Sequence, residues 1–215
     1  MYKKYVKRGI DFLVALIATP FVLILILIMA PIIYLDDHGP VFYNATRRGK
    51  DGRTFQMFKF RSMYVNSPDL KNPDGSTFNS ADDPRVTKIG KFMRKTSIDE
   101  VPQILNVLKG DMSFIGPRPT LAHTPYDQLD AMRKKRLTVR PGITGYAQAY
   151  YRNSITQDEK FQYDCYYTDH VTFLLDIKIF LKTIFSVLGR KNIYVSETNA
   201  TEGTEQNENN TKESL

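Results

Sequence analysis

The longest apolar stretch of the chain covers residues 12–35, in which no residue is charged. A straight helix of these 24 residues would be about 36 Å long, enough to cross a hydrocarbon core of about 30 Å. Thr19-Pro20 interrupts the stretch, because Pro20 has no amide hydrogen for the Leu16 carbonyl and its ring crowds that carbonyl. The Thr19 hydroxyl can bond back to Ala15, which favours a bend. The pattern therefore predicts a membrane-associated helix that is broken at Pro20.

Two membrane topologies are compatible with this stretch. The segments before and after Pro20 would be about 12 Å and about 24 Å long, so neither alone crosses the core. Positive residues, which prefer the cytoplasmic side of a membrane, flank the stretch on both sides. They are Lys3, Lys4, Lys7 and Arg8 before it and Arg47, Arg48, Lys50 and Arg53 after it. These flanks favour a re-entrant helix with both ends in the cytoplasm, but prolines are also tolerated in spanning helices, so a kinked span stays open.

The remaining pattern predicts an α+β domain that is mostly helical. Asp51-Gly52 is a strong turn signal between two apolar runs, residues 41–46 and 54–61, and predicts a β-hairpin. Apolar residues at helical spacing predict helices over residues 85–95, 101–108, 126–137 and 173–188, and Thr156-x-x-Glu159 predicts the start of another. The apolar stripe of residues 173–188 is typical of a core helix or of an interfacial amphipathic helix.

The chain divides into three parts by composition. We expect residues 1–36 to form the membrane segment, residues 37–194 a globular domain, and residues 195–215 a polar, disordered tail. Residues 196–215 hold five Glu and one Lys, which gives this tail a charge of −4. The net charge of the whole chain is +7, so the rest of the chain carries about +11. That balance indicates an anionic partner, which is nucleic acid, acidic lipid or a phosphorylated substrate. Cys165 is the only cysteine, which excludes an internal disulfide.

Asp99-Glu100 is the main candidate for chemistry. Ser97-x-x-Glu100 matches a capping box, and acids in a first turn are stabilised by the helix dipole, so helix capping is one explanation of the pair. Pro102 favours a different register, with Asp99 as the N-cap. Pro102 then lies in the first turn, where a residue donates no helical hydrogen bond, so its missing amide hydrogen is not needed. That register predicts the Asp99 carboxylate at the mouth of a helix, where phosphate groups bind readily.

Several arginines could supply the charge partners of a phosphate near this pair. Arg94 lies five residues before Asp99, Arg118 stands in the stiff segment Gly116-Pro117-Arg118-Pro119, and Arg152 follows another constrained turn. A preorganised guanidinium binds phosphate through two hydrogen bonds. The sequence has no Walker-type phosphate loop and no dinucleotide fingerprint. Together with the membrane segment, these residues indicate phosphoryl chemistry on a lipid-linked substrate.

These stretches together resemble the bacterial sugar transferase family, the small monotopic phosphoglycosyl transferases. The matching motifs run in order along residues 4–193. They are Lys-Arg-Gly-Ile-Asp-Phe at 7–12, Thr-Pro at 19–20, Gly-Pro-Val-Phe-Tyr at 39–43, Lys-Phe-Arg-Ser-Met at 59–63, Arg-Lys-Thr-Ser-Ile-Asp-Glu-Val-Pro-Gln at 94–103, Asn-Val-Leu-Lys-Gly-Asp-Met-Ser at 106–113, Gly-Pro-Arg-Pro at 116–119 and Arg-Pro-Gly-Ile-Thr-Gly at 140–145.

The resemblance implies an activity and a place in the cell. The enzyme would move a sugar-1-phosphate from a UDP-sugar to polyprenyl (undecaprenyl) phosphate, the first membrane step of capsule, exopolysaccharide or glycoprotein glycan assembly. It would lie in the bacterial cytoplasmic membrane, with a re-entrant helix broken at Thr19 and Pro20 and the catalytic domain in the cytoplasm. Nucleic acid would not be a partner, and a homodimer is possible.

The resemblance also implies roles for individual residues. Asp99 would attack the β-phosphate and form a sugar-phosphoryl-aspartate, which polyprenyl phosphate then attacks. Glu100 would hold Mg²⁺ or manage a proton, and with Asp99 it would form the metal site. Phosphate and nucleotide contacts would come from Arg94, Arg118, Arg152 and Lys59. The alternative from the residues alone is a basic, membrane-anchored module that binds anionic lipid or nucleic acid without catalysis.

Overall fold

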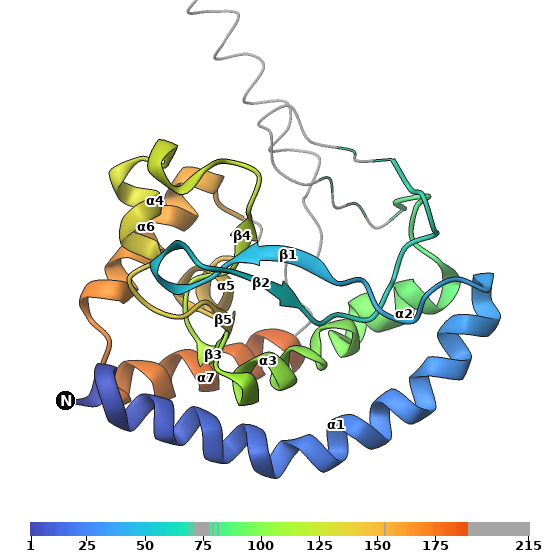
Figure 1. Ribbon diagram of the computed structural model, residues 1–215, viewed down its shortest axis with the longest axis horizontal. Helices are drawn as coiled ribbons and strands as arrows, with labels where there is room; N and C mark the ends of the chain where they lie inside the picture. Colours follow the sequence, from blue (N-terminus) through green and yellow to red (C-terminus); the bar gives the residue numbers. More distant parts are fainter. Residues whose placement is uncertain (69, 71–77, 79, 81, 153, 189–215) are drawn as a thin grey trace, which may run out of the picture.

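The computed structural model describes residues 1–68, 70, 78, 80, 82–152 and 154–188. The fold is α+β and mostly helical, as the sequence predicts, with a long N-terminal helix along one side of the domain and two small sheets among shorter helices (Figure 1). The helices are α1 (Lys7–Asp37), α2 (Lys88–Thr96), α3 (Gln103–Lys109), α4 (Ala131–Arg136), α5 (Tyr146–Tyr150), α6 (Gln157–Asp169) and α7 (Phe173–Leu188). The predicted tail, residues 195–215, lies outside the described residues.

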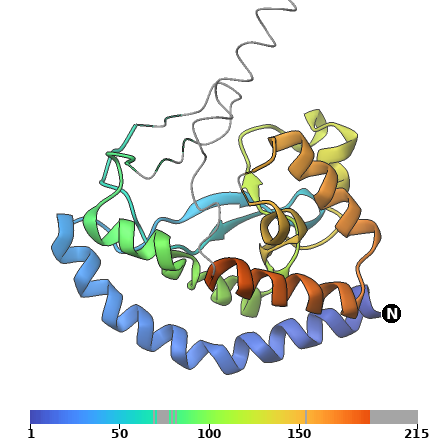
Figure 2. The ribbon, with the colours of Figure 1, turned by 180° about the vertical axis from the view of Figure 1, so that it is seen from behind.

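Helix α1 is continuous, and the predicted break at Pro20 is not observed. A π-helical turn, Tyr2–Val6, leads into α1, which runs through Pro20 and Pro31 to Asp37. The Thr19 hydroxyl donates to the Ala15 carbonyl over 2.7 Å, as expected. Both views show the helix bowed around the domain (Figures 1 and 2). Gradual bending, together with a side-chain bond of this kind, lets a helix accommodate a proline without ending.

One stripe of α1 packs against the domain along most of the helix. Ala15, Val22, Met29 and Ile33 are all buried, and their spacings of seven and four residues place them on one face. Ala15 packs with apolar side chains of strand β2 (Thr54–Met57) and helix α3, whereas Met29 and Ile33 pack against Phe60 and helix α2. Most other apolar side chains of α1 are exposed. Within the described part of the chain, this helix alone is long and apolar enough to cross a membrane.

The first turns of α1 are tied to α3 and α7 by polar contacts. Lys7 Nζ lies 2.8 Å from Asp176 Oδ2 of α7, and the Tyr2 hydroxyl donates to the same oxygen over 2.6 Å. The Arg8 guanidinium donates to two carbonyls in the last turn of α3, at 2.7 and 3.1 Å. A cation at the C-terminal end of a helix satisfies carbonyls that have no partner within it. The N-terminal segment is therefore part of the domain's structure.

Two small sheets complete the domain. Strands β1 (Ala45–Arg48) and β2 (Thr54–Met57) pair antiparallel, and β4 (Thr120–Leu121) pairs with the other edge of β1. The pair lies where the sequence predicts a hairpin, but its strands are shorter than predicted, and residues 41–44 belong to no strand. The turn contains Asp51 and Gly52 at φ 55° and 80°, in the left-handed region that this turn signal favours. Strands β3 (Ser113–Ile115) and β5 (Gly142–Thr144) pair in parallel.

The helices after β4 can be compared with the helices that local sequence signals predict. Thr156 and Glu159 form the predicted capping box at the start of α6. The single helix predicted over residues 126–137 is wrong, because a 3-10 turn (Tyr126–Gln128) precedes α4, and Asp130 caps α4 separately. Helix α7 packs against the core through Ile179, which is fully buried, while an apolar row along the helix is exposed; the interfacial role stays a prediction. That row is Phe173, Leu174, Ile177, Phe180, Leu181, Ile184 and Phe185.

Candidate active site

Asp99 and Glu100 lie in a single 3-10 turn, Ile98–Glu100, between α2 and α3. Helix α2 ends at Ser97, whose φ of 58° turns the chain sharply. The Asp99 carbonyl then accepts a hydrogen bond from the Phe60 amide over 3.0 Å. Since Phe60 is itself fully buried, this contact holds the turn against the core. The Asp99 side chain is only 4% exposed.

The predicted helix register at this pair is wrong. Helix α3 begins at Gln103, with Pro102 in the N-cap position, so Asp99 lies a turn earlier and does not cap the helix. The capping-box explanation fails as well, because the Ser97 side chain makes no cap hydrogen bond. Pro102 needs no backbone donor in the observed register either, since it precedes the first hydrogen-bonded turn. With both capping explanations gone, the pair has no role in starting α3.

Lys59 is the cation that joins the two carboxylates. Its ammonium lies 2.8 Å from Asp99 Oδ2 and 3.4 Å from Glu100 Oε1. Lys59 precedes Phe60 in the chain, so the backbone bond from Phe60 to Asp99 also brings Lys59 to the pair. The resemblance made Lys59 the weaker candidate, whereas the structure gives it the shortest contact with Asp99.

Arg118 makes the second contact with the pair. Its Nη2 lies 3.3 Å from Glu100 Oε1, and its side chain is 58% exposed, so Arg118 joins the site to the solvent-facing surface. Gly116 fixes the loop before it, since a Cβ at Gly116 would lie 2.4 Å from the Arg140 carbonyl oxygen. Burial raises the pKa of Glu100, but the charges of Lys59 and Arg118 outweigh that effect and lower it to about 2. Glu100 is therefore fully ionised at neutral pH.

The other two predicted arginines do not contact the carboxylates. Arg94 on α2 donates from Nε to the Ser62 hydroxyl over 3.0 Å. Arg152 follows α5 with a φ of 50°, and burial lowers the pKa of its guanidinium. Among the ion pairs of the described residues, neither arginine is joined to Asp99 or Glu100. The structure therefore assembles Asp99, Glu100, Lys59 and Arg118, and places Arg94 and Arg152 outside direct contact.

Arg47 is a nearby cation that the sequence did not identify as a site residue. It was counted only among the positive residues that flank the apolar stretch. In the structure it lies on β1 and lines a small cavity together with Arg118 and Gln103. Arg47 and Arg48 are adjacent arginines, and no local sequence pattern distinguishes one from the other. The signal is tertiary, because Arg47 meets residues from two distant segments.

Asp99 and Glu100 match the one or two carboxylates that a protein usually contributes to a magnesium site. The described residues include no group of three or more His, Cys, Asp or Glu that could hold a metal ion. Mg²⁺ is usually bound through one or two carboxylates, with substrate phosphates and water supplying the other ligands. Asp99 and Glu100 are adjacent carboxylates held by a cation they could share with a phosphate. They can therefore contribute to such a site only when a phosphorylated substrate completes it.

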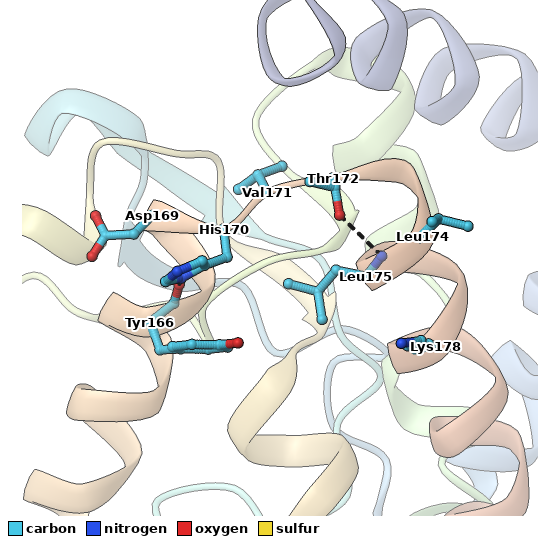
Figure 3. A pocket seen from close by; sticks show the side chains of 8 residues that line it. All are labelled: Tyr166, Asp169, His170, Val171, Thr172, Leu174, Leu175 and Lys178. Atoms are coloured by element: carbon cyan, nitrogen blue, oxygen red, sulfur yellow. Dashed lines mark hydrogen bonds between the residues drawn. The ribbon is translucent and has the colours of Figure 1, made fainter.

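The larger of the two cavities described lies elsewhere. It has a volume of about 390 Å³ and is lined by the end of α6, the following loop and the start of α7 (Figure 3). The rings of Tyr166 and His170 stack at one side with centroids 4.2 Å apart, and Lys178 stands at the other. None of its lining residues belongs to the carboxylate pair or its cation partners. We therefore assign the candidate site from its chemistry and not from cavity size.

Comparison with known proteins gives a family and several relatives for this chain. A family model described as "Bacterial sugar transferase" matches residues 2–190, well over half of the chain. The chain is 43% identical to a UDP-N-acetylgalactosamine-undecaprenyl-phosphate N-acetylgalactosaminephosphotransferase of Aeromonas hydrophila, over 86% of this chain and 44% of that protein. It is 40% identical to EpsL, an uncharacterised sugar transferase of Bacillus subtilis, over 85% of this chain and 87% of EpsL.

A third relative has a named donor and acceptor. It is a UDP-glucose:undecaprenyl-phosphate glucose-1-phosphate transferase of Xanthomonas campestris, 40% identical over 86% of this chain and 39% of that protein. The chain thus spans less than half the length of the relatives whose names state an activity. It spans most of the length of EpsL.

Proposed function

The chain belongs to the bacterial sugar transferase family, and on that premise we propose that it moves a sugar-1-phosphate from a UDP-sugar to undecaprenyl phosphate. The observation that carries the proposal is the buried Asp99 carboxylate, which shares the Lys59 ammonium with Glu100. A carboxylate is an established covalent nucleophile, and it needs a fixed orientation to act as one. The named relatives from Aeromonas and Xanthomonas have UDP-sugars and undecaprenyl phosphate in their names, which supports this donor and this acceptor.

In the first step, Asp99 forms a covalent intermediate. A carboxylate oxygen of Asp99 attacks the β-phosphorus of the donor, and the bond from that phosphorus to the bridging oxygen breaks. Uridine monophosphate leaves with that oxygen, and a sugar-phosphoryl-aspartate remains. Lys59 holds the attacking carboxylate in place, and its positive charge is available to the phosphoryl oxygens as the carboxylate's charge is consumed.

In the second step, the lipid acceptor takes the sugar-phosphate. A phosphate oxygen of undecaprenyl phosphate attacks the same phosphorus, the bond to Asp99 breaks, and the carboxylate is restored. The product is an undecaprenyl-diphospho-sugar. This acceptor is already ionised near neutral pH, so the step needs no strong base. A two-step path through one nucleophile matches a site with a single buried carboxylate of this kind and an exposed arginine, Arg118, beside it.

Glu100 is better suited to binding a cation than to transferring a proton. A general base works best when its pKa lies near the working pH, and the pKa of Glu100, about 2, lies far below it. We therefore assign Glu100, with Asp99, to holding Mg²⁺ when the donor is bound. Bound Mg²⁺ would neutralise charge on the diphosphate. Lys59 and Arg118 keep Glu100 ionised, which is the form that a metal ion requires.

We propose that α1 enters the membrane and leaves it on the cytoplasmic side. Asp11 accepts a hydrogen bond from the Phe114 amide over 3.2 Å, and Ile33 packs against Phe60. These two positions are about 33 Å apart along a helix, yet both contact the same domain. A straight span would instead carry one of them to the opposite side of the bilayer. The exposed apolar faces of α1 and α7 would then rest in the lipid.

Labelling from the two sides of the membrane tests this topology. Lys4→Cys and Arg53→Cys, each in a Cys165→Ser background, place one thiol before α1 and one after it. We expect both thiols to react from the cytoplasmic side only, in inverted vesicles. Labelling of the Lys4→Cys thiol from the outer side of intact cells would show that α1 spans the membrane.

The covalent intermediate gives the test of the activity. The purified protein is incubated with a panel of UDP-sugars and Mg²⁺ without lipid acceptor, and its intact mass is measured. We expect one donor to add a sugar-phosphate, Asp99→Asn to add none, and Asp51→Asn, an exposed Asp in the hairpin turn, to react normally. If no donor gives an adduct, or if Asp99→Asn still makes undecaprenyl-diphospho-sugar, the mechanism is wrong. Salt-sensitive lipid binding that is indifferent to Asp99 would favour the non-catalytic alternative.

A further inference from the structure

Two neighbouring arginines on β1 have different surroundings. The Arg48 side chain is buried, and its guanidinium donates to the carbonyls of Gly52, Ala122 and Thr124. These bonds tie the hairpin turn to the segment after β4. Its donors are directed at backbone oxygens, so Arg48 has a structural role that explains its burial.

Arg47 points to the opposite face of β1, since side chains alternate along a strand. Its Nε is buried and has no hydrogen-bond partner in the part of the chain that the structure describes. Burial lowers the pKa of its guanidinium, the charge of Arg118 lowers it further, and Tyr43 and Glu100 raise it. A buried donor on a charged group that lacks an acceptor destabilises the folded state. Burying such a group therefore lowers the stability of the fold unless a bound ligand supplies the acceptor.

The cavity beside Arg47 has the size of a single oxygen atom. Its volume is about 20 Å³, and roughly 10–15 Å³ is enough for one water-sized group. Arg47, Gln103 and Arg118 provide its polar lining, and Gln103 is itself only 3% exposed. Two guanidinium groups and an amide around one small space form a site for an anionic oxygen. Glu100, the carboxylate whose charge acts on Arg47, is already paired with Lys59 and Arg118.

We propose that Arg47 binds the phosphate of the leaving nucleoside monophosphate, with one phosphate oxygen in this cavity. The proposal rests on the function proposed above. In the proposed reaction, the phosphorus under attack lies about 3–3.5 Å from the Asp99 carboxylate, whose cation partner is Lys59. Arg47 has no ion pair with Asp99 and instead lies beside Arg118, which contacts Glu100. It therefore meets the neighbouring phosphate of the donor diphosphate, where negative charge develops as the bridging bond breaks.

Binding of uridine monophosphate tests this assignment without turnover. Titration calorimetry on the full chain in detergent compares wild type with Arg47→Gln, Arg47→Lys and Arg53→Gln, an exposed arginine of the same hairpin. We expect Arg47→Gln to weaken nucleotide binding at least tenfold and Arg47→Lys to weaken it less, because an ammonium keeps the charge without the two-pronged geometry. Arg53→Gln should bind as wild type does.

Kinetics separate the donor side from the acceptor side. Arg47→Gln should raise the KM for the UDP-sugar and slow adduct formation ten- to a hundredfold, with the KM for undecaprenyl phosphate unchanged. A shift in the acceptor KM alone would overturn the proposal and move the site to the lipid phosphate. Wild-type nucleotide affinity in folded Arg47→Gln or Arg47→Lys would also overturn it. If the wild type binds the nucleotide through Arg47 but forms no adduct, the covalent mechanism fails while this site stands.

Discussion

Replacing Lys59 by Met should separate the orientation of the nucleophile from the rest of the site. Met keeps much of the side-chain volume and removes only the ammonium, which lies 2.8 Å from Asp99 and 3.4 Å from Glu100. Each attraction at a few ångströms is on the order of 4 kcal/mol before solvation is subtracted. Loss of one preorganised charge of this kind slows catalysis by about 10²–10³-fold. We expect adduct formation from the UDP-sugar to slow by that factor.

The pH dependence gives a second measure of the same change. The pKa of Glu100 is about 2 in the folded protein, below the ordinary value of a Glu carboxyl. The ionised carboxylate therefore stabilises the fold at any pH above that ordinary value, and this stabilisation is lost as the pH falls from about 4.5 through about 2. Without Lys59, burial is opposed only by Arg118, so the pKa of Glu100 rises. The Lys59→Met variant should therefore lose activity on acidification at a higher pH than wild type.

The measurement is the rate of the mass increase on mixing with donor, followed between pH 5 and 8. Lys50→Met, at an exposed lysine of the hairpin turn, is the matched control and should react as wild type does. Far-UV circular dichroism checks folding, because the chain has no Trp to report on it. A folded Lys59→Met protein that forms adduct within threefold of the wild-type rate would refute this account of the site.

Three further changes test the fold by thermal unfolding in detergent. Gly90→Ala should destabilise the folded protein by about 1–3 kcal/mol, because the added Cβ would lie 2.1 Å from the Ser62 carbonyl oxygen. Gly9→Ala is the control, since its added Cβ would have nothing within 4 Å, and it should be neutral or stabilising. Equal melting shifts in the two variants would contradict this. Asp176→Asn should destabilise by about 3 kcal/mol, since three side chains bond its carboxylate; an unchanged melting temperature would show that α1 does not depend on this contact. Thr156→Ala should lose about 1 kcal/mol, and wild-type stability would show that the capping box is unimportant.

Local signals in the sequence were reliable where the deciding contacts are local. The capping box of Thr156 and Glu159 depends on backbone donors three residues away, and it forms as predicted. Gly110 follows the last turn of α3 at a φ of 98°, in the left-handed region that glycine adopts readily at a helix end. The same reasoning failed at Pro20, because a side-chain bond from Thr19 and gentle bending keep α1 continuous. Its packing against the domain then supports the bent helix.

By itself, the sequence predicted the membrane segment and the mostly helical α+β class, and it singled out the Asp99-Glu100 pair as the candidate for chemistry. These follow from hydrophobicity, periodicity and the types of neighbouring residues. Only the tertiary structure decided which cations meet the pair. Lys59 is 41 residues from Glu100 in the chain, and a backbone hydrogen bond between Phe60 and Asp99 brings it there. Arg47 and Arg48 look alike in sequence, and only the face of β1 on which each one lies separates a structural arginine from one that faces the site.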